Sequence, residues 1–122
     1  MNIEELRTFC LLKPGVTEEL PFDNDTLVFK VMGKIFVLTS LAHWETGEPS
    51  INVKCDPKEA LKLREKYPQV IPGYHMSKKH WNTVHINTGF PDQKILHFIN
   101  HSYDLVVSKL TKKLRDQLQN EN

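Results

Sequence analysis

The sequence predicts an α+β fold, a two-layer sandwich in which helices cover one face of an antiparallel sheet. Apolar residues recur at helical spacing at the start, middle and end of the chain, and at a spacing of two residues in between. Short turns join consecutive extended segments, which favours antiparallel pairing. The expected order is α-β-β-β(β)-α-β(β)-α, and residues 1–122 are short enough to form a single domain.

The first half of the chain is predicted to hold one helix and three strands. A helix is expected over residues 2–12, where four apolar side chains share a face: Ile3, Leu6, Phe9 and Cys10. Pro14 and Gly15 end it. Residues 16–22 alternate weakly, and residues 26–32 and 34–41 are two strong strands around a glycine turn, which is typical of a β-hairpin.

The second half is predicted to alternate between strands and helices. Residues 42–49 are polar and are expected to form a projecting loop, and residues 50–55 alternate as a strand. Asp56 is placed to cap a helix that ends before Pro68. An irregular stretch and a strand over residues 81–87 follow.

The last helical stretch opens at Pro91 and Asp92. Its apolar stripe continues to Leu118, but Thr111 is a plausible second cap. One long helix and two shorter helices both fit this pattern.

The charge of the chain is unevenly distributed. The formal net charge is +1, but residues 1–60 carry six basic and ten acidic side chains, whereas residues 61–122 carry ten basic and five acidic ones. A uniformly basic protein of the histone kind is excluded, whereas one localised basic face is allowed.

Composition and cysteine usage predict a soluble, cytoplasmic, monomeric protein. The apolar content of 39% and the charged content of 25% are ordinary for a folded domain. Cys10 and Cys55 lie on apolar faces of their elements and outside any paired-cysteine motif, as expected of buried, reduced thiols. The longest apolar run, residues 35–38, is too short for a membrane span, and the acidic N-terminus is unlike a signal peptide.

The densest group of chemically versatile side chains lies in residues 72–84, PGYHMSKKHWNTV. Its lysines suit phosphate oxygens, its aromatic rings offer flat faces, and its amide and hydroxyl groups can bond bases or phosphates. The candidate nucleic-acid-binding residues are Tyr74, His75, Lys78, Lys79, His80, Trp81, Asn82 and Thr83. A purely structural interpretation also fits, with a Pro-Gly corner, packed aromatics and solvated lysines.

Other groups of polar side chains give weaker evidence of a functional site. His97 and His101 share a helix face, but no third metal ligand is placed by spacing. No nucleotide-binding glycine motif or nucleophile elbow occurs, so we predict no catalytic residue, no metal and no cofactor. A second basic cluster is formed by Lys112, Lys113 and Arg115.

Residues 72–84 resemble the signature P-G-Y-H-M-[SN]-K-K-H-W-N-T-V of the MmcQ/YjbR-like family of small bacterial proteins. Further agreement lies in VFKVMGKIFVL, in INVKCDP and in SYDLVVSKLTKKLR, so the resemblance covers essentially the whole chain. It implies a fold like that of secretion chaperones. It also implies DNA binding, because the family is described with a double-wing DNA-binding motif.

The leading hypothesis is therefore a non-enzymatic protein that binds double-stranded DNA through a basic surface around Lys78, Lys79 and His80. Lys54 belongs to this predicted surface, and Lys30 and Lys34 are expected to extend it. The alternative is a protein-interaction adaptor with no nucleic-acid role. A third hypothesis is a small-ligand or metal site that uses four histidines and one tyrosine: Tyr74, His75, His80, His97 and His101.

Overall fold

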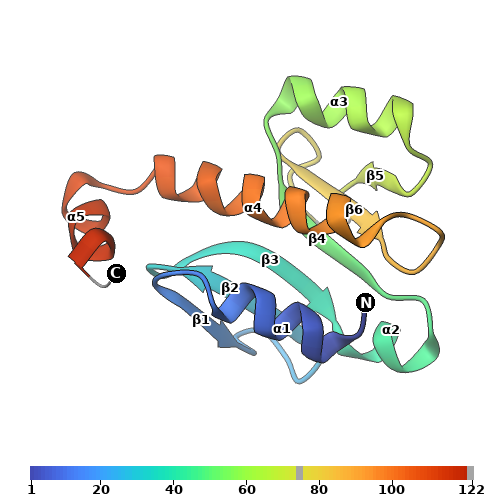
Figure 1. Cartoon of the computed structure of the whole chain (residues 1–122), viewed down its shortest axis with the longest axis horizontal. Coiled ribbons are helices and arrows are strands. Elements are labelled where there is room, and N and C mark those ends of the chain that lie inside the picture. Colours follow the sequence, from blue (N-terminus) through green and yellow to red (C-terminus); the bar gives the residue numbers. More distant parts are fainter. Residues whose placement is uncertain (74–75, 121–122) are drawn as a thin grey trace.

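A computed structural model of the chain describes residues 1–73 and 76–120. Within these residues a single six-stranded sheet has the order β1-β2-β3-β4-β6-β5, and every neighbouring pair is antiparallel (Figure 1). The strands are β1 (Val16–Glu19), β2 (Thr26–Val31), β3 (Lys34–Ser40), β4 (Ser50–Lys54), β5 (Val70–Pro72) and β6 (Trp81–His85). The helices are α1 (Ile3–Leu11), α2 (Leu41–Thr46), α3 (Pro57–Lys66), α4 (Asp92–Ser108) and α5 (Lys112–Asn120). The predicted α+β class is confirmed.

One face of the sheet carries the apolar core. The register sets Phe29 opposite Val37 and Val37 opposite Val53, so these three side chains point to the same face. All are almost fully buried; α4 packs against β2, β3 and β4, while α1 packs against β1 and α3 against β5. The two-layer arrangement predicted from the alternation of apolar residues is therefore present.

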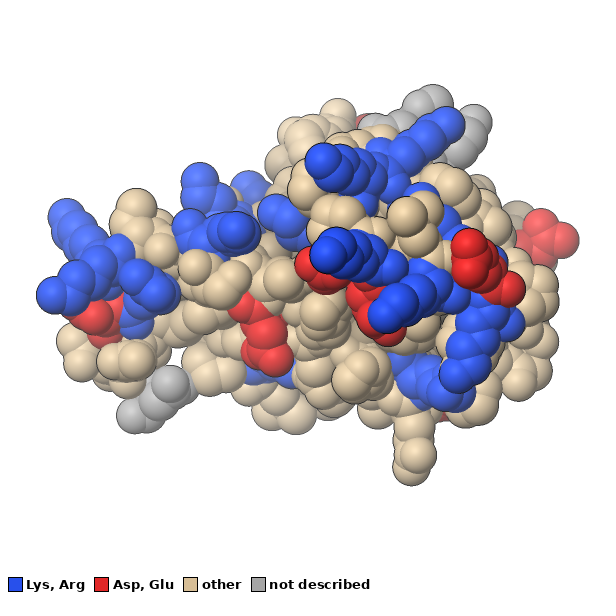
Figure 2. All heavy atoms as spheres, turned by 90° about the horizontal axis from the view of Figure 1, so that it is seen from above, with Lys and Arg blue, Asp and Glu red and all other residues tan. Residues whose placement is uncertain are grey.

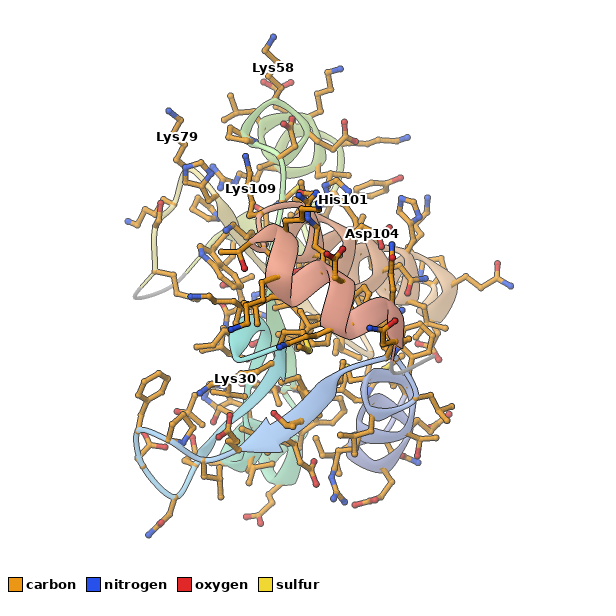
Figure 3. All side chains as sticks on the ribbon, turned by 90° about the vertical axis from the view of Figure 1, so that its left-hand side faces the viewer. Lys30, Lys58, Lys79, His101, Asp104 and Lys109 are labelled. Atoms are coloured by element: carbon orange, nitrogen blue, oxygen red, sulfur yellow. The ribbon has the colours of Figure 1, made fainter. Side chains whose placement is uncertain are left out.

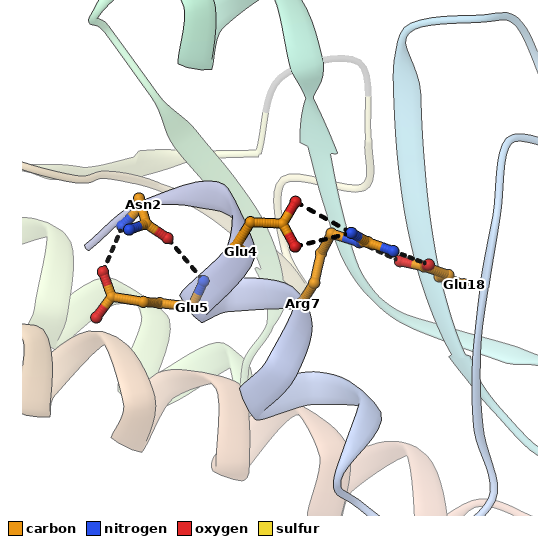
Figure 4. A network of polar contacts seen from close by, with 5 residues as sticks. All are labelled: Asn2, Glu4, Glu5, Arg7 and Glu18. Atoms are coloured by element: carbon orange, nitrogen blue, oxygen red, sulfur yellow. Dashed lines mark hydrogen bonds and ion pairs between the residues drawn. The ribbon is translucent and has the colours of Figure 1, made fainter.

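The helix ends follow the capping signals of the sequence. Asn2 and Glu5 form a reciprocal capping box at the start of α1 (Figure 4). The Asp56 carboxylate accepts hydrogen bonds from the backbone N–H groups of Lys58 and Glu59 at the start of α3. The Thr111 hydroxyl accepts a 3.2 Å hydrogen bond from the Leu114 N–H, so the last stretch is two helices rather than one.

Ser102 of α4 connects the helix layer to two strands. Its hydroxyl donates to the Phe36 carbonyl at 2.6 Å and accepts from the Lys54 N–H at 2.8 Å. The β3–β4 ladder extends only from the Val37–Val53 pair to the Thr39–Ile51 pair. Ser102 therefore bridges the two strands where they separate, and it fixes α4 across them.

Three local predictions were wrong. Residues 42–49 do not form an open loop, because α2 begins at Leu41 and the Trp44 Nε1–H donates to the buried Thr39 hydroxyl. β1 ends at Glu19, so the predicted extension to residue 22 is missing. Residues 70–72 form the edge strand β5 in the stretch that was expected to be irregular.

A helix that crosses a lipid bilayer must be long and predominantly apolar. None of the helices in residues 1–73 and 76–120 is long and apolar enough to do so.

Candidate nucleic-acid interface

The two signature lysines lie in a tight turn that leads into β6. The N–H groups of His80 and Trp81 both donate to the Ser77 carbonyl, at 3.2 and 2.9 Å, which closes the turn. Lys78, Lys79 and His80 are all exposed. The turn therefore presents its charged side chains to solvent, as the sequence predicted.

This turn is attached to the end of β4. The Cys55 N–H donates to the His80 carbonyl at 2.7 Å, and Lys54 pairs with Trp81 in the antiparallel register. Lys54 was predicted from sequence to join the basic surface, and the ladder brings it beside the turn.

Arg64 of α3 holds the same turn from the helix layer. Its Nε donates to Asn82 Oδ1 at 2.7 Å, and its Nη2 donates to the carbonyls of Lys78 and Trp81. Sequence reasoning missed this residue. A signal was present, because Arg64 follows the buried Ala60 by four residues and so lies on the same helix face.

Gly73 allows β5 to approach β6 closely at the base of the turn. A Cβ atom at this position would lie 2.8 Å from the Trp81 Cβ and 3.0 Å from the Trp81 carbonyl oxygen. The Gly73 N–H also donates to that oxygen at 2.9 Å. The glycine of the signature is therefore needed for packing in this structure.

A hollow lies where the start of β3 and the end of β4 meet the end of α4. Lys34 of β3, Lys54 of β4 and Lys109 after α4 line it, and its volume is about 230 Å³. We use the name basic surface for this hollow together with the turn and the start of α5. Its members are Lys34, Lys54, Lys78, Lys79, Lys109, Lys112, Lys113 and Arg115.

Two views show how these charges are distributed. In Figure 2, Lys and Arg side chains gather over α5, the adjoining part of α4 and α3. In Figure 3, Lys79, Lys109 and Lys58 lie in the upper half of the molecule, whereas Lys30 lies in the lower half beside the β1–β2 region. Lys and Arg side chains thus gather over α3, α4 and α5, with Asp and Glu side chains among those over α3.

Ion pairing divides the cations into two groups. Arg7 pairs with Glu4 and Glu18, and Lys30 pairs with Glu19 at 3.0 Å. By contrast, no Lys or Arg of residues 54–120 lies within 4.0 Å of a carboxylate in the described part of the chain. Residues 54–120 contain twelve lysines and arginines against six carboxylates. Apart from Arg64, which is bonded to Asn82 and to two backbone carbonyls, these cations are therefore available to an external anion.

Several predicted site residues do not lie on this surface. Asn82 and Thr83 are only 1% and 5% exposed, since β6 lies between β4 and β5 and both of its faces are covered. The Asn82 amide oxygen accepts from Arg64, and the Thr83 hydroxyl donates to Asn52 at 2.6 Å. Their predicted contact with bases or phosphates is corrected: both side chains stabilise the sheet and its attachment to α3.

The remaining predicted residues fall into three groups. Trp81 is half-buried and packs at the start of β6, so only part of its ring is open to a ligand. Lys30 is engaged with Glu19 and does not extend the basic surface. Tyr74 and His75 lie outside the described residues.

Among residues 1–73 and 76–120, the geometry provides neither a reactive cysteine nor a cluster of metal-ligating side chains. Burial, followed by the charges of Glu59 and Asp56, raises the pKa of the Cys55 thiol to about 11, which disfavours the reactive thiolate. His101 Nε2 accepts a hydrogen bond from the Asp56 N–H at 3.4 Å, which links α4 to the start of α3. Across residues 1–73 and 76–120, no three potential metal-ligating side chains come together.

Comparison with known proteins finds relatives of almost the same length. The profile of the family described as YjbR matches residues 11–105. The chain belongs to the YjbR family. The Uncharacterized protein YbdF of Escherichia coli O157:H7 is 40% identical over 114 residues, which span 93% of this chain and 89% of YbdF.

Two further proteins match almost the whole chain, one in sequence and one in three-dimensional structure. The Uncharacterized protein YjbR of Escherichia coli K12 is 30% identical over 118 residues, 97% of this chain and 98% of YjbR. The crystal structure of Deinococcus radiodurans protein DR2400, with a domain named DUF419, superposes with a TM-score of 0.88 at 35% identity. That match covers 97% of this chain and 88% of DR2400. The family resemblance predicted from residues 72–84 is confirmed.

Proposed function

We propose that this protein binds the phosphate backbone of double-stranded DNA through the basic surface and that it performs no catalysis. The observation that supports this proposal is the contrast in ion pairing. Arg7 and Lys30, beside α1 and β1, are paired with carboxylates, whereas the cations of the basic surface have no carboxylate partner within 4.0 Å among the described residues.

Unpaired lysines on a surface are suited to phosphate because they need not break an internal ion pair before binding. Each phosphate contact releases condensed counterions from the duplex, and this release supplies most of the affinity of non-specific complexes. The cations of the basic surface come from a turn, two strands, the residue that follows α4, and α5, so they can follow a backbone rather than hold a single phosphate group.

The same structure argues against strong sequence preference. Bases are read by side chains that reach the groove edges, and Asn and Thr are typical readers. Asn82 and Thr83 are buried and hydrogen-bonded within the protein, so their side chains are not available for base contacts. The proposed complex therefore rests on phosphate contacts, which carry little sequence information.

The test is a fluorescence-anisotropy titration of a labelled duplex at several salt concentrations. We expect the Lys78→Gln/Lys79→Gln variant to lose about tenfold or more in affinity at low salt. Its slope of log K against log salt should be shallower by about 2, because two phosphate contacts are lost. A second, unrelated duplex should give nearly the same affinity as the first.

A matched pair of single variants controls for net charge. Lys79→Gln and Lys30→Gln each remove one positive charge, but Lys79 lies in the exposed turn and Lys30 is paired with Glu19. We expect only Lys79→Gln to weaken binding. Equal losses in the two variants, or an absence of binding by the wild type at low salt, would contradict the proposal. The latter result would favour the adaptor hypothesis.

A further inference from the structure

A second basic feature lies in a groove between α3 and α4, away from the exposed turn. Its volume is about 720 Å³, within the range of small-molecule sites. α3 contributes Lys62 and Lys66, α4 contributes Lys94 and His97, and Tyr67 lies where α3 ends. The residues of the exposed turn do not line this groove.

Two ammonium groups converge on one aromatic ring at one end of the groove. Lys66 Nζ and Lys94 Nζ lie 5.2 and 5.1 Å from the centre of the Tyr67 ring, within cation–π range. Hydrogen bonding from Lys94, then from Lys66, lowers the pKa of the Tyr67 hydroxyl. No carboxylate of the described residues lies within 4.0 Å of either lysine. An anion can therefore bind both ammonium groups and the phenol hydroxyl.

The wall beside this end is apolar and ordered. Leu63 and Phe98 line it, and Phe90 links the aromatic groups behind it. The Phe90 ring lies edge-on to Tyr67 at 5.0 Å and stacks with Phe98 at 5.9 Å. Because these rings are held by one another, the groove has a preformed apolar wall against which a flat ligand can pack.

The opposite end of the groove has hydrogen-bond acceptors. Asp56 and Glu59, at the start of α3, line it. Glu59 and Lys66 are seven residues apart on one helix, which corresponds to about 10 Å along its axis. The groove therefore has a cationic end and a carboxylate end about the length of a nucleotide apart. Leu63 and Phe98 form the apolar part of its wall, and Lys62, His97 and His101 also line it.

We propose that this groove binds a small phosphate ester with a planar ring, of the nucleoside monophosphate class. The phosphate lies at Lys66, Lys94 and Tyr67, and the ring packs on Leu63 and Phe98. Hydroxyl or amino groups of the sugar or the ring donate hydrogen bonds to the carboxylates of Asp56 and Glu59. This site is separate from the basic surface and does not depend on DNA binding.

The test is an NMR chemical-shift titration of the full chain with adenosine 5′-monophosphate. Inorganic phosphate and adenosine are titrated in parallel. We expect shifts that map to α3 and to the start of α4, with adenosine 5′-monophosphate binding at least about tenfold more tightly than either part. Equal affinity for inorganic phosphate would overturn the assignment of a ring-bearing ligand, and no shifts at millimolar concentration would overturn the site.

Matched double variants locate the site. Lys66→Gln/Lys94→Gln should weaken binding by about tenfold or more, and Tyr67→Phe should weaken it less while keeping the ring. Lys30→Gln/Lys58→Gln removes the same charge outside both the groove and the basic surface, and should bind like the wild type. Equal weakening in the two double variants would overturn the proposal, because it would show a general charge effect.

Discussion

The guanidinium of Arg64 determines where the Lys78–Lys79 turn lies relative to the helix layer. It donates to the buried Asn82 side chain and to two backbone carbonyls. These acceptors belong to the turn and to the first residues of β6, whereas Arg64 belongs to α3. A single side chain thus couples the exposed lysines to the core.

Replacing Arg64 with Met should destabilise the fold. The Asn82 amide oxygen, which is almost inaccessible to water, would lose its donor, at a cost of about 2–3 kcal/mol. Urea denaturation measures this loss. Lys58→Met, at an exposed position of the same helix, is the control and should change the free energy of unfolding by less than about 0.5 kcal/mol. Equal effects of the two substitutions would show that Arg64 is not an anchor.

The contrast between lysines and their neighbours shows what the sequence can predict at this scale. The exposure of Lys78 and Lys79 was predictable because ammonium groups are rarely buried. The burial of Asn82 and Thr83 was not, since it requires knowing that β4 and β5 flank β6 on both sides. Short polar side chains fit either a surface or a satisfied interior, and only the tertiary partners distinguish them.

Among the elements, those with strong periodicity or a capping signal were predicted close to their true bounds. The hairpin β2–β3, the strand β4 and the helix α3 are examples. The failures have tertiary causes. α2 forms where the Trp44 indole reaches Thr39, and β5 is a three-residue edge strand that depends on β6 for its hydrogen bonds. Segments this short are held by such contacts and show no hydrophobic periodicity from which they could be predicted.

The attachment of α1 to β1 should be sensitive to acid. Arg7 binds Glu18 through two hydrogen bonds, at 2.8 and 2.5 Å, and this contact lowers the pKa of the Glu18 carboxyl (Figure 4). The resulting stability is fully present above the unfolded pKa of about 4.3. It is lost as the pH falls through the lower folded value.

The test is Glu18→Gln, compared by urea denaturation at pH 7 and at pH 2.5. The substitution should lower the free energy of unfolding by about 0.5–1 kcal/mol at pH 7 and by less at pH 2.5. Glu45→Gln is the control, because Glu45 is exposed on α2 and has no ion-pair partner among the described residues. A Glu18→Gln effect of equal size at both pH values would contradict the proposed role of the charge.

For the molecule as a whole, the uneven charge of the sequence becomes a division between two regions. Acidic residues of α1 and β1 pair with Arg7 and Lys30, while the lysines of residues 54–120 remain without carboxylate partners in the described structure. The net charge of +1 hides this division. The sequence count permitted such an arrangement, but the proximity of Lys34, Lys54 and Lys109 depends on how α4 crosses the sheet.

The buried Cys10 thiol reports on the stability of the whole fold. Cys10 is 0% exposed, and burial raises the pKa of its thiol to about 12. Because the folded pKa is raised, the contribution of this thiol to stability is fully present below the unfolded thiol pKa of about 8.5. It is lost as the pH rises toward the folded value. Labelling of Cys10 with a disulfide reagent at pH 8 should therefore require global opening.

The Cys55→Ala variant isolates Cys10 for this measurement. The labelling rate of Cys10 in this variant should be lower than in the urea-unfolded chain. The ratio of the two rates should equal the equilibrium constant for unfolding of the variant. Cys10→Ala isolates Cys55, which is 4% exposed and should be labelled faster through local opening near the start of α3. Rapid labelling of Cys10 in the folded protein would contradict the packing of α1 on the sheet.

The Ser102 bridge has a consequence for the architecture of the basic surface. β3 and β4 stop pairing beyond the Val37–Val53 pair, and the serine hydroxyl supplies the partner that each strand lacks there. The two strands are thus joined through the serine where their ladder ends, and Lys34, Lys54 and Lys109 line one hollow there. The backbones that carry Lys34 and Lys54 are therefore linked through one hydroxyl group in the interior.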